Sequence, residues 1–334
     1  MRKIVLLSLL ILATVVLAFS WGLWNYLNTT PGGSSNEKYV TIPSGTHFNQ
    51  VAKILEEEGV IVGAERFRFL AWLRGIETDI KAGDYHFNNA MTPLEVLDKL
   101  VKGEYRDHKI TIPEGFNVFQ IAEVLEREGM VEKEEFLKCA SAPDFVNSLN
   151  IKGDNLEGFL FPDTYLFRQG MGEEGILRKM VARFKEMFKE QYIKRAQELN
   201  MSIKEVITLA SIVEKETSDP SERYLIAAVF RNRLKRRMLL QSDPTVIYGL
   251  KDFNGNLTKK DLMTKTAFNT YLNRGLPPQP IANPGEESIK AVLYPSPKKY
   301  IYFVSKNDGT HHFSATLREH NQAVNRYQRK RGGG

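Results

Sequence analysis

The sequence predicts an α+β protein that begins with a membrane-spanning helix, and three observations support this class. The first 30 residues include a long run without charged side chains, a strand-and-helix motif of 22 residues occurs twice, and the C-terminal half contains amphipathic helices separated by polar loops. The chain has 334 residues, of which 42% are hydrophobic and 26% are charged. These proportions are typical of globular proteins, and the length allows two or three domains.

The composition excludes several kinds of protein and site. The single cysteine, Cys139, rules out a disulfide framework and any zinc site built from cysteines. A net charge of +6 is too small to indicate nucleic-acid binding, so we expect no nucleic-acid partner. His311 and His312 are adjacent in a predicted strand and point to opposite faces. We therefore expect neither a metal site nor a cofactor.

The N-terminal run from Ile4 to Leu27 has the length of a membrane helix. A bilayer core needs about 20 apolar residues in a helix. Arg2 and Lys3 precede the run, and the next basic residue is Lys38. The positive-inside rule then places the N-terminus in the cytoplasm and the remainder outside it. A cleaved signal peptide is the alternative, although its apolar core is usually only about 7–15 residues long.

Two details refine this prediction. Trp21, Trp24 and Tyr26 cluster at the outer end of the run, where an aromatic belt would lie. Residues 29–38 are rich in Gly and Ser, which predicts a flexible linker between the anchor and the first folded module.

An internal duplication follows the linker. Residues 40–61 align with residues 110–131, and ten of the 22 positions are identical. Each copy is typical of a short strand, a Pro-x-Gly turn and an amphipathic helix that ends at Gly59 or Gly129. Residues 81–87 and 157–167 are expected to form the return strands, and residues 92–103 a further short helix with Thr92 as its cap.

A strand–helix–helix–strand unit of this kind resembles the LysM modules. The resemblance implies binding of N-acetylglucosamine-containing glycans in cell walls. The alternative is that the copies are packing units without a ligand. We favour this alternative for the second copy and leave both open for the first.

The helix after residue 202 carries two glutamates near its end. Ser202 and Glu205 form a capping-box pattern, and apolar residues at positions 203, 206, 207, 210 and 213 predict one buried stripe. Glu214 lies on that stripe, while Glu216 lies about 200° away around the helix. The two carboxylates are therefore expected to point in nearly opposite directions and not to share a site.

Either glutamate is a candidate for acid–base chemistry. A carboxyl group among apolar neighbours should have a raised pKa, as a general acid at neutral pH requires. The alternative is that both are solvated charges at a helix end. Periodicity alone does not choose between these possibilities.

Four long segments resemble the endolytic murein transglycosylase (YceG-like) family. These are residues 156–165 (LEGFLFPDTY), residues 209–250 (which begin LASIVEKETSDPSERY), residues 266–295 and residues 300–321. The N-terminal anchor fits the same family. The resemblance implies that the second Glu of the E-K-E-T motif, Glu216, is the catalytic residue and that no metal is needed.

The resemblance also implies the reaction. An acid protonates the oxygen between MurNAc and GlcNAc, and the same residue then takes the proton of the MurNAc C6 hydroxyl, which closes a 1,6-anhydro ring. Because the nucleophile belongs to the substrate, one carboxylate suffices. The implied role is to terminate or trim nascent peptidoglycan strands at the bacterial cell membrane, with penicillin-binding synthases as possible partners.

Polar residues in two loops are candidates for binding the sugars. The first loop (QSDPTVIYG) contains Ser242, and Tyr248 in it could stack on a sugar face; the second loop is FNTYLNRGLPP. The alternative for each residue is a role in turn architecture. The expected substrate-binding residues are Gln241, Asp243, Thr245, Tyr248, Asn269, Thr270 and Tyr271.

The complete prediction is an α+β chain with a transmembrane helix, a LysM-like βααβ module and a mixed α+β lytic transglycosylase domain that contains a second LysM-like repeat. Two other functions stay open: a hydrolytic muramidase with Asp243 as the partner carboxylate, and a non-catalytic peptidoglycan-binding scaffold. The expected boundaries are 1–28 for the cytoplasmic N-terminus and anchor, 29–38 for the linker, 39–105 for the first module, and 106–330 for the catalytic domain, divided into 106–168 and 172–330.

Overall fold

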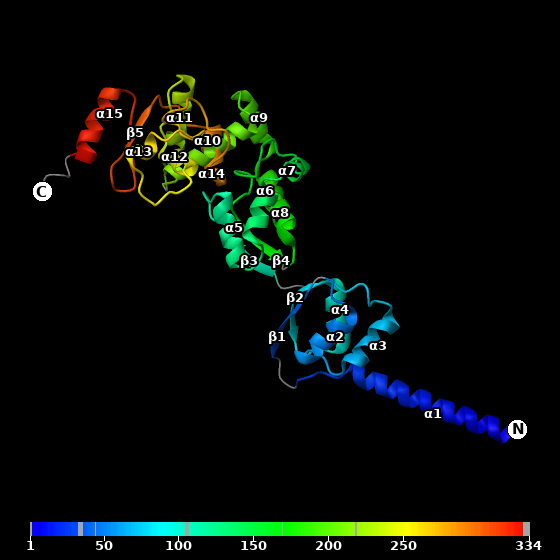
Figure 1. The fold of residues 1–334 in the computed structure, drawn as a ribbon. Coiled ribbons are helices and arrows are strands. Elements are labelled where there is room, and N and C mark those ends of the chain that lie inside the picture. The colour runs from blue at the N-terminus through cyan, green and yellow to red at the C-terminus, as the bar shows by residue number, and fades with distance from the viewer. Residues whose placement is uncertain are drawn as a thin grey trace. The chain divides into compact units, whose positions relative to one another are not determined.

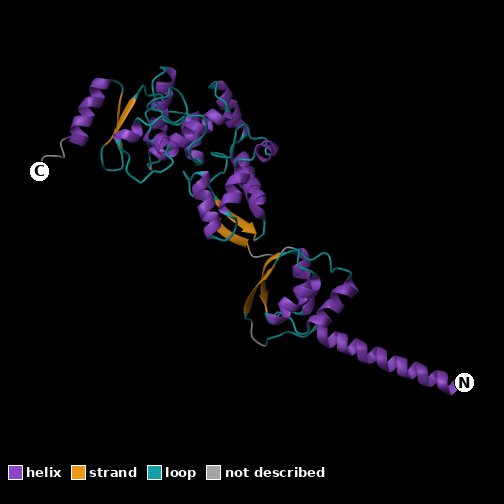
Figure 2. Ribbon diagram, in the orientation of Figure 1, coloured by secondary structure: helices purple, strands orange, loops and turns teal. Residues whose placement is uncertain are grey.

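The structure is a computed structural model that describes residues 2–32, 36–43, 45–103, 107–168, 170–217 and 219–329. It divides into two compact units. The first comprises Met1–His108 and Leu166–Met171, and the second comprises Lys109–Tyr165 and Gly172–Gly334. Figures 1 and 2 show that helices predominate and that the strands occur in pairs. A mixed α+β fold with an N-terminal apolar helix is thus what the chain forms.

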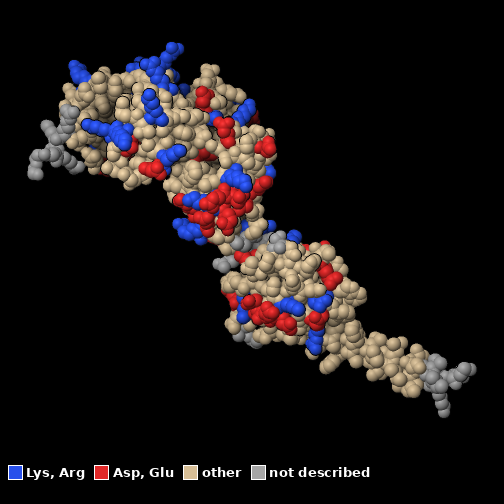
Figure 3. All heavy atoms as spheres, in the orientation of Figure 1, with Lys and Arg blue, Asp and Glu red and all other residues tan. Residues whose placement is uncertain are grey.

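Helix α1 (Arg2–Leu27) is one continuous helix. Its segment Leu6–Leu27 is long and apolar enough to cross a membrane, by length and composition. Most of its described side chains are exposed, and no Lys, Arg, Asp or Glu interrupts its surface in Figure 3. These are the properties of a membrane anchor or of a signal sequence.

The outer end of α1 differs from the expectation in two ways. Tyr26 is not part of an aromatic belt, because it is only 4% exposed and belongs to the core of the first unit. The described part of segment 29–38 is not a free tether. Asn89 binds it twice, since its carbonyl accepts from the Gly32 amide at 3.1 Å and its side chain accepts from the Asn36 amide at 2.9 Å. Residues 33–35 lie outside the described residues.

The first unit has the predicted order of strand, two helices, strand and helix. Its two strands pair in antiparallel fashion, with Val40 opposite Tyr85. The helices bury their apolar faces against this pair, and Thr92 forms the expected capping box with Glu95. Gly59 has φ +68°, which explains why the first helix stops there. The elements are β1 (Glu37–Ile42), α2 (Phe48–Glu57), α3 (Ala64–Arg74), β2 (Gly83–Asn88) and α4 (Pro93–Lys102).

The second copy of the repeat contains one more helix than expected. Its strands form a second two-stranded sheet, in which the Thr111 and Thr164 hydroxyls lie 2.8 Å apart. The extra helix begins at Pro143, a residue that favours the first turn of a helix. The elements are β3 (Asp107–Thr111), α5 (Val118–Arg127), α6 (Lys133–Ala140), α7 (Pro143–Ser148) and β4 (Thr164–Arg168).

The rest of the second unit is mainly helical, and its only described sheet is the antiparallel pair of β5 and β6. Most of its helices are short and lie around α10 (Figure 1). The elements are α8 (Gly172–Met187), α9 (Glu190–Glu198), α10 (Ile203–Glu216), α11 (Arg223–Lys235), α12 (Asp243–Gly249), α13 (Lys259–Leu262), α14 (Glu286–Leu293), β5 (Tyr302–Ser305), β6 (His311–Ser314), α15 (Leu317–Val324) and a π-helical turn, Asn325–Arg329.

Helix α10 is the central helix of this unit. Ser202 caps it with the predicted capping box to Glu205. The prediction of a single buried stripe is wrong, because every residue from 206 to 213 is buried. Helices α9, α11, α12 and α14 contact it from several sides. The buried Ser211 donates to the Thr208 carbonyl at 2.8 Å and accepts from the Ile281 amide at 3.1 Å, so its polarity is satisfied.

Candidate active site

Glu216 is the last residue of α10, and the extended backbone of Thr217 ends the helix there. Its side chain is half-buried. The Ser242 hydroxyl donates to its Oε1 at 2.5 Å. Among the described residues, none donates a hydrogen bond to the other oxygen, Oε2. One carboxyl oxygen is thus anchored by the protein and the other is available.

The surroundings of Glu216 favour its protonated form. Burial raises its pKa to about 7, and the negative charge of Asp243 acts in the same direction. The hydrogen bond from Ser242 and the positive charge of Arg233 oppose this shift, but they are weaker than the burial. The expectation of a raised pKa is confirmed for Glu216, which holds a proton for a large fraction of the time near neutral pH.

Hydrogen bonds to Thr270 position the loop before α12, and this places Ser242 against Glu216. The Ser242 amide donates to the Thr270 hydroxyl at 3.0 Å, and the Gln241 amide donates to the Thr270 carbonyl at 3.1 Å. The Thr245 hydroxyl lies 2.8 Å from that of Thr270 and donates to the Ser242 carbonyl at 2.6 Å. Hydrogen bonds thus join residues 241–245 to Thr270, which is distant in sequence.

Arg233 supports the same loop from α11. Its buried guanidinium donates to the carbonyls of Ile301 at 2.7 Å and Leu240 at 2.8 Å. Its positive charge also lowers the pKa of Glu216. The sequence gives no sign of this role, because Arg233 lies in a basic run that is typical of a helix C-terminus.

The seven expected substrate-binding residues fall into two groups. Gln241 and Asp243 are exposed, and half-buried Tyr271 donates from its hydroxyl to Asp243 at 2.5 Å. The other four are engaged inside the protein, with burial or internal hydrogen bonds that a sugar would have to displace. These are Thr245, Tyr248, Asn269 and Thr270.

Glu157 is a second carboxyl group with a raised pKa, and no sequence pattern predicted a role for it. Burial raises its pKa to about 7, against hydrogen bonds from the Val118 amide, the Tyr248 hydroxyl at 2.9 Å and the Asn283 side chain at 3.1 Å. It is only 1% exposed. Glu157 is therefore enclosed, in contrast to Glu216, and joins α12 to the start of α5.

Both carboxyl oxygens of Glu214 have polar partners in the protein. Oε1 lies 3.0 Å from the Arg223 guanidinium, and Oε2 accepts from the Gly285 amide at 3.0 Å. Its partners differ from those of Glu216, as the helical spacing predicts. The two carboxylates nevertheless line one open pocket of about 430 Å³. The two carboxylates thus have separate hydrogen-bond partners, as expected, although both border this pocket.

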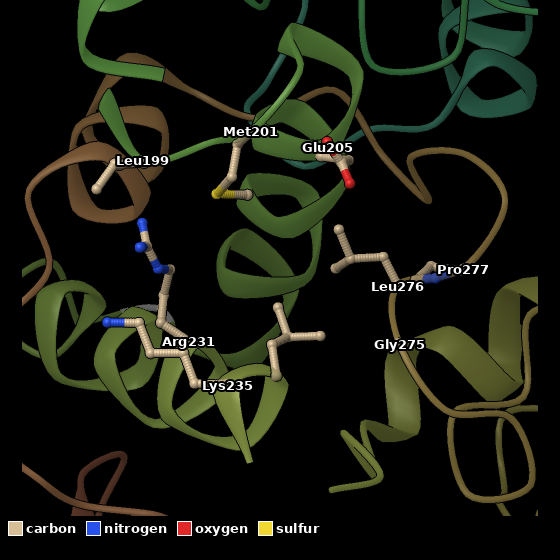
Figure 4. A pocket seen from close by; sticks show the side chains of 9 residues that line it. Leu199, Met201, Glu205, Arg231, Lys235, Gly275, Leu276 and Pro277 are labelled. Carbon is tan, nitrogen blue, oxygen red and sulfur yellow. The ribbon is translucent and has the colours of Figure 1, made fainter. Parts of the chain in front are cut away.

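A different hollow lies near the other end of α10. Figure 4 shows it between Arg231 and Lys235 on α11, Met201 and Glu205, and the loop at Leu276; its volume is about 550 Å³. Glu205 and Glu216 are separated by about 16 Å along the helix, from the rise of 1.5 Å per residue. None of the predicted sugar-binding residues lines this hollow or the pocket that Glu214 and Glu216 border.

A half-buried glutamate with a raised pKa, at the border of an open pocket, is the arrangement of an enzyme that uses general acid–base catalysis. In the described part of the chain, no cluster of His, Cys, Asp or Glu suited to a metal ion is found. Comparison with known sequences identifies the particular group of enzymes. The chain belongs to the YceG-like family, whose sequence model matches residues 40–326.

Three known proteins illustrate the similarity. The endolytic murein transglycosylase of Bacillus subtilis (strain 168) is 34% identical over 305 residues, which cover 86% of this chain and 84% of the relative. That of Streptococcus pneumoniae (strain D39) is 30% identical over 328 residues, with 88% of this chain and 59% of the relative covered. A crystal structure described as a yceG-like protein of Listeria monocytogenes has 35% identity and a TM-score of 0.60, covering 87% of this chain and 100% of the other.

Proposed function

We infer that this chain is an endolytic murein transglycosylase, and we propose that Glu216 is its catalytic acid and base. The relatives in Bacillus subtilis and Streptococcus pneumoniae carry that name and align over most of the chain. The observation that supports the role of Glu216 is its environment. Its carboxyl group has a pKa of about 7, one oxygen fixed by Ser242, and an open pocket beside it.

The family resemblance implies the reaction, and the properties of Glu216 are compatible with each step. The protonated carboxyl group of Glu216 donates its proton to the oxygen between MurNAc and GlcNAc, and the bond from C1 to that oxygen breaks. The carboxylate then accepts the proton of the MurNAc C6 hydroxyl while the C6 oxygen bonds to C1. The products are a GlcNAc hydroxyl and a 1,6-anhydro ring, no water is consumed, and Glu216 regains its proton. A pKa near neutrality suits a group that must act as both acid and base.

Two other carboxyl groups, Glu157 and Glu214, are poorly placed for this role. Glu157 is enclosed by protein, so it cannot reach a glycosidic oxygen. Glu214 is committed to Arg223 and to the Gly285 amide. Glu216 alone among these three combines a raised pKa with an oxygen that has no donor among the described residues.

We propose that some of the loop residues bind the substrate and that the others position the loop. Gln241 and Asp243 are exposed and Tyr271 is half-buried against Asp243, and these three are the proposed residues for binding sugar hydroxyl and amide groups. Residues whose polar atoms are already used inside the protein position the loop, and are not expected to contact the glycan. These are Thr245, Tyr248, Asn269 and Thr270.

A hydrolytic muramidase is the second candidate, and one observation favours it. Asp243 is near enough to Glu216 to raise its pKa, so a second carboxylate is present at the site. A hydrolase would use it to activate water and would release reducing ends. Its hydrogen bond from Tyr271 is instead consistent with a structural and substrate-binding role.

The remaining assignments are also proposals. We place residues 1–28 as an uncleaved single-pass anchor with a cytoplasmic N-terminus, and the remainder outside the cytoplasm at the bacterial cell membrane. Residues 39–105 would be a LysM-like glycan-binding module, and residues 106–330 the catalytic domain, with a second LysM-like repeat at 106–168 and the catalytic core at 172–330. Nascent peptidoglycan strands are the proposed substrate, and penicillin-binding synthases the proposed partners.

The decisive experiment is mass spectrometry of the muropeptides that the purified chain releases from peptidoglycan. We expect 1,6-anhydro ends, which are lighter than reducing ends by one water. Glu216→Gln should abolish them without unfolding the protein. Glu214→Gln is the matched control, one helical half-turn away, and should still make anhydro ends. Loss of product from the control but not from Glu216→Gln would show that the wrong glutamate was assigned. A Glu216→Gln variant with full cellular function would indicate a non-catalytic scaffold.

A further inference from the structure

Helix α3 in the first unit has apolar residues on two opposite sides. One side, which includes Phe67 and Leu70, is buried in the core of that unit. On the other side, Phe69, Trp72 and Leu73 are 39%, 62% and 51% exposed. At about 100° per residue these three lie within an arc of about 100° that is centred opposite to the buried side. We call Phe69, Trp72 and Leu73 the outer face of α3.

The outer face is continuous with the apolar surface of α1. The ring of Phe69 lies 6.1 Å from the ring of Phe19 on α1, edge to face, and 5.8 Å from the ring of Trp72. Both helices belong to the first unit, and Tyr26 near the end of α1 is part of its core. In Figure 1, α1 leaves this unit beside α3. The attachment of α1 to the unit is thus fixed on both sides of Trp21 and Trp24.

The length of α1 then decides where the outer face lies. If the first unit stayed clear of the bilayer, Phe19 and all later residues of α1 would stay clear with it. Only about 15 uncharged residues, from Ile4 to Ala18, would be left to cross the membrane. At 1.5 Å per residue they span about 22 Å, which is shorter than a hydrocarbon core of about 30 Å. The run from Ile4 to Asn25, which ends just before the buried Tyr26, spans about 33 Å and would fit.

We propose that the outer face of α3 is inserted into the outer leaflet of the membrane that α1 crosses. This inference rests on the proposed membrane anchor and not on the proposed catalytic reaction. With Ile4–Asn25 in the bilayer, Phe19 lies about 9 Å inside its outer end, and Phe69 lies in the bilayer beside it. Phe, Trp and Leu are the side chains that interfacial helices use for this purpose.

The residues that flank the outer face fit a lipid surface. Arg66 and Arg68 border the arc on its two sides, where they can meet lipid phosphates. Glu65 is the one acidic residue of the helix, and Arg68 neutralises it through a hydrogen bond of 2.9 Å. A single spanning helix leaves a domain free to rotate about the helix axis. Insertion of α3 provides a second attachment away from that axis and holds the first unit in one orientation on the membrane.

Tryptophan quenching in lipid nanodiscs tests this inference with the full chain. The chain has three tryptophans, so Trp21→Phe with Trp24→Phe leaves Trp72 as the sole probe. We expect lipids with brominated acyl chains to quench Trp72 severalfold more than aqueous iodide does. A control with Phe at positions 21, 24 and 72 and Tyr39→Trp places the probe on β1, where Tyr39 is exposed. That probe should respond to iodide and not to bromolipid.

Other results would overturn the inference in distinguishable ways. If Trp72 responds like the probe at position 39, the outer face lies in water. Protection from both quenchers would indicate that a second protein molecule covers it. The Trp72→Phe variant retains Trp21 and Trp24 and reports on α1 itself. If bromolipid fails to quench this variant, α1 does not lie in the bilayer. The proposal for α3 is then wrong, whereas the proposed catalytic role of Glu216 is unaffected.

Discussion

Ser242 donates a hydrogen bond of 2.5 Å to Oε1 of Glu216, 26 residues earlier in the chain. The donor comes from a loop that Thr245, Thr270 and Arg233 hold in place, and the acceptor comes from the end of the buried helix α10. The bond leaves the other carboxyl oxygen without a donor among the described residues. It also opposes the effect of burial on the pKa of Glu216.

The pH dependence of the reaction should reflect Glu216. The first step needs its protonated form, and its pKa is raised to about 7. We therefore expect kcat/KM for cleavage of a glycan strand to be level below that pH and to fall about tenfold per pH unit above it. Initial rates at low substrate concentration between pH 5 and 9 measure this. A profile that falls only around pH 4 to 5, near the pKa of an ordinary Glu, would contradict the role.

Ser242→Ala should move this profile toward higher pH. Removing the hydrogen bond takes away an influence that lowers the pKa of Glu216. Loss of one such bond also costs orientation of the carboxyl group, for which about tenfold in kcat is a reasonable size. The same rate measurements check both effects, and Ser242→Thr should restore part of the loss. An unchanged profile would mean that the bond is not formed in solution.

Asp243→Asn should move the profile in the opposite direction. The charge of Asp243 raises the pKa of Glu216, so its removal lowers that pKa and brings the fall in rate to lower pH. The products should still carry anhydro ends, because no second carboxylate takes part in ring closure. Complete loss of cleavage, together with reducing ends from the unmodified protein, would support the muramidase instead.

Glu157→Gln should stabilise the second unit, and more so at high pH. A carboxyl group with a folded-state pKa of about 7, against an ordinary value of 4.5, binds its proton more tightly when folded. The unmodified protein therefore loses stability as pH rises from about 4.5 to about 7, and a neutral Gln does not. The advantage of Gln should grow by about 2 kcal/mol between pH 5 and pH 8.

Hydrogen exchange of peptides from α10 can measure this difference, because it reports the opening free energy of the second unit alone. The contribution of Glu216 is the same in both proteins and cancels. A difference that does not change with pH would show that burial does not raise the pKa of Glu157.

Local patterns in the sequence were sufficient for several elements. The duplicated motif predicted β1 and α2, and the Thr92 and Ser202 capping boxes formed as expected. Patterns of this kind involve residues close in sequence, whose hydrogen bonds form within one turn of helix. The 24-residue uncharged run likewise predicted the apolar helix α1, because length and composition alone decide whether a helix can span a bilayer.

The environment of each side chain depended on segments that are distant in the chain. Periodicity predicted one buried stripe for α10, whereas neighbouring helices bury it on every side. The sequence could not distinguish Glu214 from Glu216 on physical grounds. The difference arises because Arg223 and Gly285 bind both carboxyl oxygens of Glu214, whereas Ser242 binds only one carboxyl oxygen of Glu216.

The same reasoning applies to Glu157, Tyr26 and the outer face of α3, whose settings appear only when distant residues meet. Family resemblance was enough to predict the class of enzyme, which the comparisons confirm, and it pointed to Glu216 as the candidate catalytic residue. Tertiary packing decided which carboxyl groups hold a proton and which can reach a substrate, because burial and hydrogen bonding set a pKa and both depend on the folded arrangement.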